Sequence, residues 1–257
     1  MLFLSWTKPL CYRGNFFPSI QLFALLQDHE AMFHSFSASP SKYSSFQEKP
    51  SISRKRKVVV FKDFRHVNNL DHAVSVFNQM VQTKPIPSVV EFAKLLRVMI
   101  NKKYYCGVVS FFGEMRKLGV PFDDYILTSV IDSFCLLGCT EHGFSVLGIF
   151  FKSGVQFNVV TFSTLIRGLC EQNKIKDAMW LFNKLVTEKI CKIDEVMFGT
   201  VMNGLCKQGH TQTALSLLRI MEQGGPKPNT IVYSIVVDAL CKDKMVGAAF
   251  NLFNEMK

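Results

Sequence analysis

Long hydrophobic runs are absent from the 257-residue sequence. Lys, Arg, Asp or Asn interrupts every apolar stretch before it approaches the roughly 18 residues that a membrane-spanning helix requires. We therefore expect no membrane span. Hydrophobic residues nevertheless make up 48% of the chain, which indicates a protein folded around a core and excludes wholesale disorder, a collagen-like repeat and a mucin-like stalk.

Catalytic motifs are also missing. The sequence contains no GxGxxG dinucleotide-binding motif, no HExxH metal motif and no GxSxG nucleophile motif. The segment from Gly204 to Thr211 has the glycine spacing of a phosphate-binding loop, but His210 stands where the essential Lys belongs and no strand precedes it. We therefore predict a protein that is not an enzyme and needs no cofactor.

Acidic residues are in the minority. Lys and Arg number 30 against 20 Asp and Glu, and the formal net charge of +10 favours a polyanionic partner such as nucleic acid. The densest basic run is Arg54–Lys57, a kind of segment that is more often a solvated charged face than a binding patch.

The beginning of the chain has no acidic residue from Met1 to Gln27, where Lys8 and Arg13 lie among bulky apolar residues. A Ser-rich stretch follows, up to Ser53. This composition is typical of an organelle transit peptide, whereas the charges and prolines interrupt the apolar segment that a secretory signal needs. We assign residues 1–53 to a transit peptide and disordered leader; an ordinary disordered leader is the alternative.

Internal repetition organises the remainder of the chain. The segment VVTFSTLIRGLC, starting at Val159, aligns with EVMFGTVMNGLC at Glu195 and TIVYSIVVDALC at Thr230. Weaker copies begin at Val89 and Asp124, so that successive starts are 35 or 36 residues apart. The half-copy that begins LDHAVSVF places a further, partial unit at residue 54.

Each unit predicts a pair of antiparallel helices. Apolar residues recur at i, i+3, i+4 and i+7 in both halves, and a turn with polar residues or Gly, such as Gly138, separates the halves. A pair of this size cannot bury both faces alone, so neighbouring pairs must stack on a shared core. We predict an all-α fold without a sheet, an α-solenoid whose pairs wind into a right-handed superhelix with an extended groove.

The predicted array occupies residues 54–257, with units starting near 54 (partial), 89, 124, 159, 195 and 230 (incomplete). The last unit stops at Lys257 without a polar terminal repeat, so we expect a truncated product or a fragment. Four cysteines occupy the twelfth place of their units: Cys135, Cys170, Cys206 and Cys241. We predict packing roles and free thiols, and no metal site, because no His or close second Cys pair completes a tetrahedral ligand set.

The repeated words VVTFSTLIRGLC and NTIVYSIVVDALCK, followed by AMWLFNKL and AAFNLFNEM, resemble the P-type pentatricopeptide repeat family. The related tetratricopeptide repeat has a 34-residue period, and its Trp-Leu-Gly-Tyr word is missing. The segments PSVVEFAKLL and FGEMRKLGV further resemble the restorer-of-fertility-like branch of plant pentatricopeptide proteins. The deaminase-like tail of some members is not expected, since no His-x-Glu with Pro-Cys-x-x-Cys occurs.

The resemblance implies sequence-specific binding of single-stranded RNA, one base per repeat, read by the fifth and the last residue of each repeat. The implied base-reading residues are Ala93 with Asp123, Thr128 with Asn158, Ser163 with Asp194, Gly199 with Asn229, and Ser234. The second residues would wedge between bases: Val90, Tyr125, Val160, Val196 and Ile231. The family's phosphate-contacting Lys is matched by Lys207 and Lys242, whereas Leu136 and Glu171 take that place elsewhere.

By the family's code, Thr128 with Asn158 reads adenine and Ser163 with Asp194 reads guanine, while Ala93 and Gly199 bring no side-chain hydrogen bond. We expect a monomer that acts on mitochondrial transcripts in RNA processing, stability or translation, with chloroplast as the alternative organelle and organellar RNA-processing proteins as further partners. The other readings are a protein-binding adaptor like tetratricopeptide solenoids, a non-functional remnant, and a nuclease, for which only the acidic pair Asp123 and Asp124 is available.

Overall fold

The computed structural model describes residue 64, residues 66–156 and residues 158–256. The predicted leader and residues 54–63 of the partial unit, which include the basic run Arg54–Lys57, lie outside the described residues. Within the described ranges every regular element is an α-helix, and no strand occurs there. The prediction of an all-α fold is confirmed.

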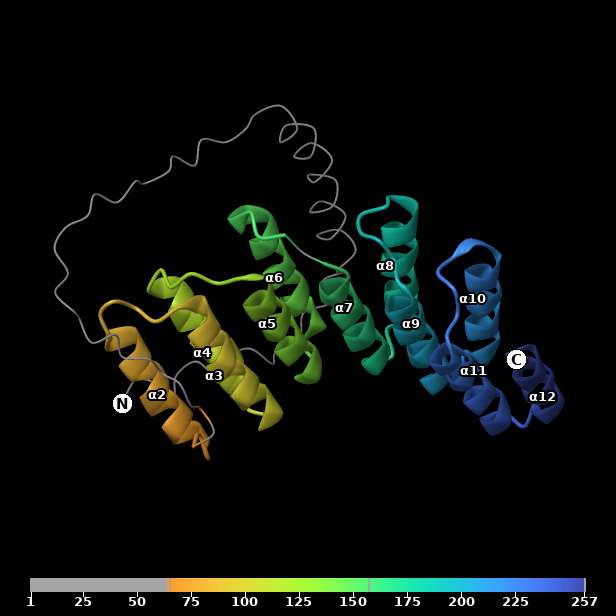
Figure 1. The fold of residues 1–257 in the computed structure, drawn as a ribbon, viewed down its shortest axis with the longest axis horizontal. Coiled ribbons are helices and arrows are strands. Elements are labelled where there is room, and N and C mark those ends of the chain that lie inside the picture. The colour runs from red at the N-terminus through yellow and green to blue at the C-terminus, as the bar shows by residue number, and fades with distance from the viewer. Residues whose placement is uncertain (1–63, 65, 157, 257) are drawn as a thin grey trace, which may run out of the picture. The chain divides into compact units, whose positions relative to one another are not determined.

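The helices form consecutive antiparallel pairs (Figure 1). The first helices of the pairs are α3 (Val89–Asn101), α5 (Asp124–Leu136), α7 (Val159–Glu171), α9 (Glu195–Lys207) and α11 (Thr230–Lys242). The second helices are α4 (Tyr105–Lys117), α6 (Thr140–Ser153), α8 (Ile175–Thr187), α10 (Thr211–Gly224) and α12 (Val246–Glu255), and α2 (Leu70–Gln82) precedes the first pair. Each first helix begins at a residue where the sequence periodicity starts a repeat.

The pairs stack through their first helices. Helix α5 contacts α3 before it and α7 after it, and the same contact joins α7 to α9 and α9 to α11. Each second helix also contacts the first helix of the next pair, as α6 does with α7. This arrangement of stacked helix pairs on one continuous core is an α-solenoid.

The turn between the two helices of a pair has a residue with positive φ at the same place in every repeat. It is the fifteenth residue of the repeat: Lys103, Gly138, Asn173, Gly209 and Lys244. Gly adopts this left-handed region without cost, and Asn does so more readily than most residues. The Gly and polar residues that the sequence analysis placed in these turns therefore reverse the chain between the two helices.

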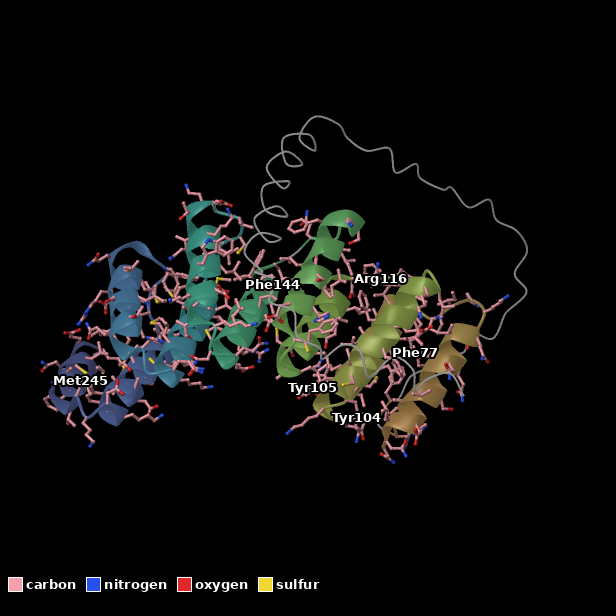
Figure 2. The ribbon with its side chains drawn as sticks, turned by 180° about the vertical axis from the view of Figure 1, so that it is seen from behind. Phe77, Tyr104, Tyr105, Arg116, Phe144 and Met245 are labelled. Atoms are coloured by element: carbon pink, nitrogen blue, oxygen red, sulfur yellow. The ribbon has the colours of Figure 1, made fainter. Side chains whose placement is uncertain are left out.

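The core is built from the apolar stripes of both helices. Phe162 and Leu165 on α7 and Leu181 and Phe182 on α8 are all at most 2% exposed. At the start of the array, Phe77 points from α2 toward the next helices (Figure 2). Its ring stacks on that of Phe111 of α4, with ring centroids 4.3 Å apart. This contact anchors α2 to the pair that follows it.

Candidate nucleic-acid interface

One face of each inner first helix, α5, α7 and α9, stays accessible while most of the remaining residues of the helix are buried. On α7 this face carries Val160, Ser163, Arg167 and Glu171, and Phe162 and Leu165 beside them are buried. These residues are the second, fifth, ninth and thirteenth of their repeat, a spacing that keeps side chains on one side of a helix. We call the surface made by these four places on successive first helices the groove face.

The second place of each repeat presents an apolar side chain to solvent. The exposed fractions are 57% for Val90, 42% for Tyr125, 56% for Val160, 64% for Val196 and 70% for Ile231. Single exposed apolar residues are ordinary, but five at the same place on stacked helices form a row. Such a row offers apolar surface between which flat bases can insert.

The fifth place carries small side chains. Thr128 and Ser163 are half-buried and Ser234 is exposed, whereas Gly199 is buried and, like Ala93, has no side-chain hydrogen-bonding group. The Ser163 hydroxyl donates to the Val159 carbonyl at 2.9 Å. Since that bond uses the hydroxyl proton, the oxygen of Ser163 is left as an acceptor for a ligand.

Thr128 has a different environment from Ser163. Its hydroxyl lies 3.0 Å from the hydroxyl of Thr161, the third residue of the next repeat. Either of the two threonine hydroxyls can donate to the other, so the Thr128 hydroxyl can present a donor or an acceptor to a ligand. Ser234 resembles Ser163, because its hydroxyl donates to a backbone carbonyl, that of Thr230, at 2.7 Å.

The last residues of the repeats cap the helices that follow them. The side-chain oxygen of Asp123 accepts from the Ile126 amide at 2.9 Å, and that of Asp194 accepts from the Met197 amide at 2.9 Å. Asp and Asn are among the preferred residues at this position because the first amides of a helix have no partner within it.

The two asparagines at the last place make the same bonds. Asn158 Oδ1 accepts from the Val160 amide at 2.9 Å, and Asn229 Oδ1 accepts from the Val232 amide at 3.0 Å. With Oδ1 held in this way, the group that does not cap is the NH₂ donor in each asparagine and a second carboxylate oxygen, an acceptor, in each capping aspartate. The identity of the last residue therefore decides whether a donor or an acceptor is left for a ligand.

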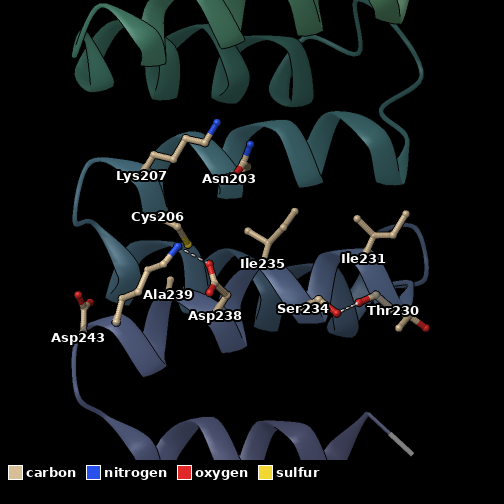
Figure 3. Close-up of a pocket in the computed structure, with 11 residues that line it drawn as sticks. Asn203, Cys206, Lys207, Thr230, Ile231, Ser234, Ile235, Asp238, Ala239 and Asp243 are labelled. Atoms are coloured by element: carbon tan, nitrogen blue, oxygen red, sulfur yellow. Dashed lines mark hydrogen bonds and ion pairs between the residues drawn. The ribbon is translucent and has the colours of Figure 1, made fainter.

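The two predicted phosphate-contacting lysines differ in their surroundings. A groove of about 620 Å³ between α9 and α11 is lined by both, together with Asn203, Ser234 and Asp238 (Figure 3). Lys242 donates to Asp238 at 2.6 Å, and this bond raises the pKa of the ammonium group. Lys207 is exposed, and no described residue forms an ion pair with it.

The ninth place adds a charged contact between neighbouring helices. Arg167 on α7 forms an ion pair with Asp132 on α5, and both side chains are partly exposed. Arg97 takes the same place on α3 and is exposed, Asn203 takes it on α9 and Asp238 on α11. Charged and polar groups thus line the groove face one helical turn beyond the fifth residues.

Two of the four cysteines of the twelfth place lie where first helices stack, whereas Cys206 is only partly buried and Cys241 is exposed, so the packing role predicted for Cys241 is not seen. Cys135 and Cys170 are each 4% exposed, and burial raises the pKa of the Cys135 thiol to about 12 and that of Cys170 to about 11. Each lies against a glycine of the next repeat: a Cβ added to Gly168 would stand 2.5 Å from the Cys135 sulfur, and one added to Gly204 would stand 2.4 Å from the Cys170 sulfur. The positions of these two thiols fit the predicted packing role.

Among the described residues, no group of three His, Cys, Asp or Glu side chains is placed to hold a metal ion. No helix in the described ranges is both long and apolar enough to cross a membrane.

Three segments of the chain match models of known repeats. Residues 193–242 match the PPR repeat family, and residues 153–186 and 231–257 match the PPR repeat. These segments of the chain are pentatricopeptide repeats. The assignment of the chain to the restorer-of-fertility-like branch of pentatricopeptide repeat proteins stays a prediction.

Relatives and solved structures of pentatricopeptide repeat proteins agree with the fold. A pentatricopeptide repeat-containing protein of Arabidopsis thaliana, named as mitochondrial, is 35% identical over 114 residues, which are 44% of this chain and 19% of the relative. The crystal structure of the maize pentatricopeptide repeat protein PPR10 covers 72% of this chain and 26% of its own, with 21% identity and a TM-score of 0.58. PPR10 in complex with an 18-nt psaJ RNA element gives 19% identity and a TM-score of 0.59 over 70% of this chain and 27% of its own. The chain thus spans less than a third of the length of each of these proteins.

Sequence reasoning missed two features of these pentatricopeptide repeats. The first is the capping bond of the last residues, for which the signal was present as Asp or Asn directly before each apolar-periodic helix. The second is the ninth place with its ion pair between Arg167 and Asp132. The ninth residue lies four residues after the fifth and therefore on the same helix face, a spacing that can be read from the sequence alone. The base-reading and wedge roles themselves stay predictions.

Proposed function

We propose that the repeat array binds single-stranded RNA sequence-specifically along the groove face. The observation that carries this proposal is the recurrence of the same set on stacked first helices: an exposed apolar second residue and a last residue whose polar group is oriented by a helix cap. The fold likeness to PPR10, whose structure contains RNA, supports the same conclusion. Unpaired bases expose both flat faces and Watson–Crick edges, which such a surface contacts.

The orientation of Asn158 favours adenine at the repeat that starts at Asp124. Its outward NH₂ group donates to Asp124 Oδ2 at 3.2 Å and has a second hydrogen for a ligand. On its Watson–Crick edge adenine presents an acceptor, N1, beside a donor, the N6 amino group. The Asn158 amide is able to donate to N1 while the Thr128 hydroxyl accepts from N6.

The orientation of Asp194 favours guanine at the next repeat. The outward carboxylate oxygen of Asp194 is an acceptor, and so is the hydroxyl oxygen of Ser163. The Watson–Crick edge of guanine presents two neighbouring donors, N1–H and the N2 amino group. Two protein acceptors facing two base donors complete both hydrogen bonds, whereas adenine would leave an acceptor facing an acceptor.

The repeats that carry Ala93 and Gly199 discriminate less between the four bases. Ala93 has no polar side-chain group and Gly199 has no side chain, so at these repeats only Asp123 and Asn229 contribute a polar group. We therefore propose recognition centred on an adenine–guanine step, with weaker preferences on either side. Because so few bases are read, this segment alone distinguishes a limited number of sites.

The biological setting that we propose is an organelle, in the first place the mitochondrion, because a relative from Arabidopsis thaliana is named as mitochondrial. There the array would act by occupying a transcript and by blocking or recruiting other factors in processing, stability or translation. We propose no catalytic step for the repeats themselves, and single-stranded RNA and organellar RNA-processing proteins are the partners.

The test is selection of RNA by the full 257-residue chain from a randomised pool of short single strands at near-physiological salt, followed by sequencing. We expect enrichment of adenine followed by guanine, with the adenine preference lost in Thr128→Ala and the guanine preference lost in Ser163→Ala. A double-stranded DNA pool of the same length is the control for general charge attraction. Retention no better than this control would contradict the proposal and favour a protein-binding adaptor or an inactive remnant.

A further inference from the structure

The groove face carries fewer free positive charges than its sequence provides. Of the cations at the ninth and thirteenth places of the described first helices, Arg167 and Lys242 are ion-paired, while Arg97 and Lys207 are exposed. The carboxylates that pair with the first two, Asp132 and Asp238, both stand at the ninth place. The same surface that is proposed to face RNA thus holds its own counter-charges.

The geometry of the two pairs differs, but their effect is the same. Asp132 reaches across from α5 to Arg167 on α7, whereas Asp238 and Lys242 lie four residues apart on α11, with 2.6 Å between nitrogen and oxygen. In the groove between α9 and α11, Asp238 lies on α11 one helical turn after Ser234, and Lys207 extends from α9 on the other side of the groove, away from α11 (Figure 3). Each carboxylate thus stands on the groove face four residues after a fifth residue, Thr128 or Ser234, and so one helical turn from a predicted base-reading side chain.

A carboxylate in this place opposes RNA binding in two ways. It repels the phosphates, and it occupies the cation that a phosphate would otherwise contact. Binding of RNA gains free energy when phosphates replace small ions around the protein and the strand, and a cation already neutralised by a protein carboxylate brings less of that gain. Removing the negative charge without changing the shape of the side chain should therefore strengthen binding.

Resting on the proposed function, we infer that Asp132 and Asp238 hold Arg167 and Lys242 away from the RNA backbone and so limit the affinity of the groove. The two carboxylates set how tightly RNA binds, while the fifth and last residues set which bases are preferred. This division separates affinity from base selection within one surface.

The experiment compares the full chain with Asp132→Asn, Asp238→Asn and the double variant. Binding of a fluorescent uridine-rich RNA that carries one adenine–guanine step is measured by anisotropy over a range of salt concentrations. We expect each single change to tighten binding roughly three- to tenfold at moderate salt, and the double change to tighten it further. The slope of log affinity against log salt should steepen by up to about 0.7 for each cation released.

Glu114→Gln is the matched control. It also removes one negative charge from an ion pair with a lysine, Lys117, at 2.8 Å, but it lies on α4, a second helix away from the groove face. The inference is wrong if Asp132→Asn and Asp238→Asn change affinity and salt slope no more than Glu114→Gln does. Circular dichroism of all variants checks that the helices are retained.

A coupling measurement tests the route through Arg167. We expect Arg167→Ala to weaken binding more in the Asp132→Asn background than in the unaltered chain, because only there is the guanidinium released. Equal losses in the two backgrounds would overturn the assigned role of Asp132. If the unaltered chain selects adenine–guanine but the aspartate variants bind no tighter, the proposed function stands and this inference falls; if the unaltered chain binds no RNA, both fall.

Discussion

The buried face and the groove face of a single first helix, α7, show how the repeat separates stability from recognition. The buried face carries Phe162, which is fully buried, and Gly168, which lies against Cys135 of the preceding repeat. The groove face carries Val160, which is 56% exposed, and Ser163. Residues of the two faces alternate within a few positions, so substitutions one or two residues apart should affect different properties.

The largest difference is expected between Phe162→Ala and Val160→Ala. Truncation of a fully buried phenylalanine removes apolar contacts and leaves a cavity, which costs about 3–5 kcal/mol of the free energy of unfolding. Truncation of the half-exposed valine should change it by no more than about 0.5 kcal/mol. Urea unfolding followed by circular dichroism measures both.

The same two variants separate the faces in an RNA-binding assay. Val160→Ala should weaken retention of the adenine–guanine RNA, because it removes apolar surface from the row of second residues, although the protein stays folded. The comparison of faces fails if Val160→Ala destabilises the array as much as Phe162→Ala, or if it leaves RNA retention unchanged.

A smaller effect is expected where first helices approach closely. A Cβ at Gly168 would lie 2.5 Å from the Cys135 sulfur and 2.7 Å from its Cβ, so Gly168→Ala should force the two helices apart at a cost of about 1–3 kcal/mol. Gly113 on α4 is the matched control, since an added Cβ there meets nothing within 4 Å. Gly113→Ala should instead stabilise the helix by up to about 1 kcal/mol. If Gly168→Ala and Gly113→Ala shift the urea midpoint equally, the close approach of α5 and α7 does not exclude a side chain at residue 168.

The helical fold was predictable because burial imposes its period on the sequence. The spacing of Phe162, Leu165, Ile166 and Leu169 requires one helix face to be covered, and its recurrence every 35 or 36 residues requires the covering surface to be another copy. The structure confirms the α-solenoid, and its first helices start where these words start. Periodicity alone therefore determined the architecture.

The polar contacts of the groove were only partly predictable. The sequence places Asp132 and Arg167 at the same repeat place, but it does not say that Arg167 pairs with the aspartate of the preceding helix, because that choice depends on the register of two stacked helices. The cap bonds depend likewise on backbone geometry before each helix. Residue identity thus gave candidate groups, and only the structure gave their partners.

The sharpest change in specificity is expected at Asp194, which caps α9 and is also a proposed base-reading residue. Asp194→Ala removes the bond to the Met197 amide and should cost about 0.5–2 kcal/mol, as the loss of a helix cap does. Asp194→Asn keeps the cap, because Asn and Asp are about equally good there, and should change the free energy of unfolding by less than about 0.5 kcal/mol.

The base preference should nevertheless reverse in Asp194→Asn. Its capping oxygen remains bound to the Met197 amide, so the outward group changes from a carboxylate acceptor to an NH₂ donor, which complements N1 of adenine and opposes N1–H of guanine. Selection from the randomised RNA pool should then replace adenine–guanine by adenine–adenine, with urea unfolding as the control for the intact cap. If the Asp194→Asn variant keeps its preference for guanine while its stability is unchanged, the cap orients the side chain without that side chain reading the base, and recognition at this repeat rests on Ser163 alone.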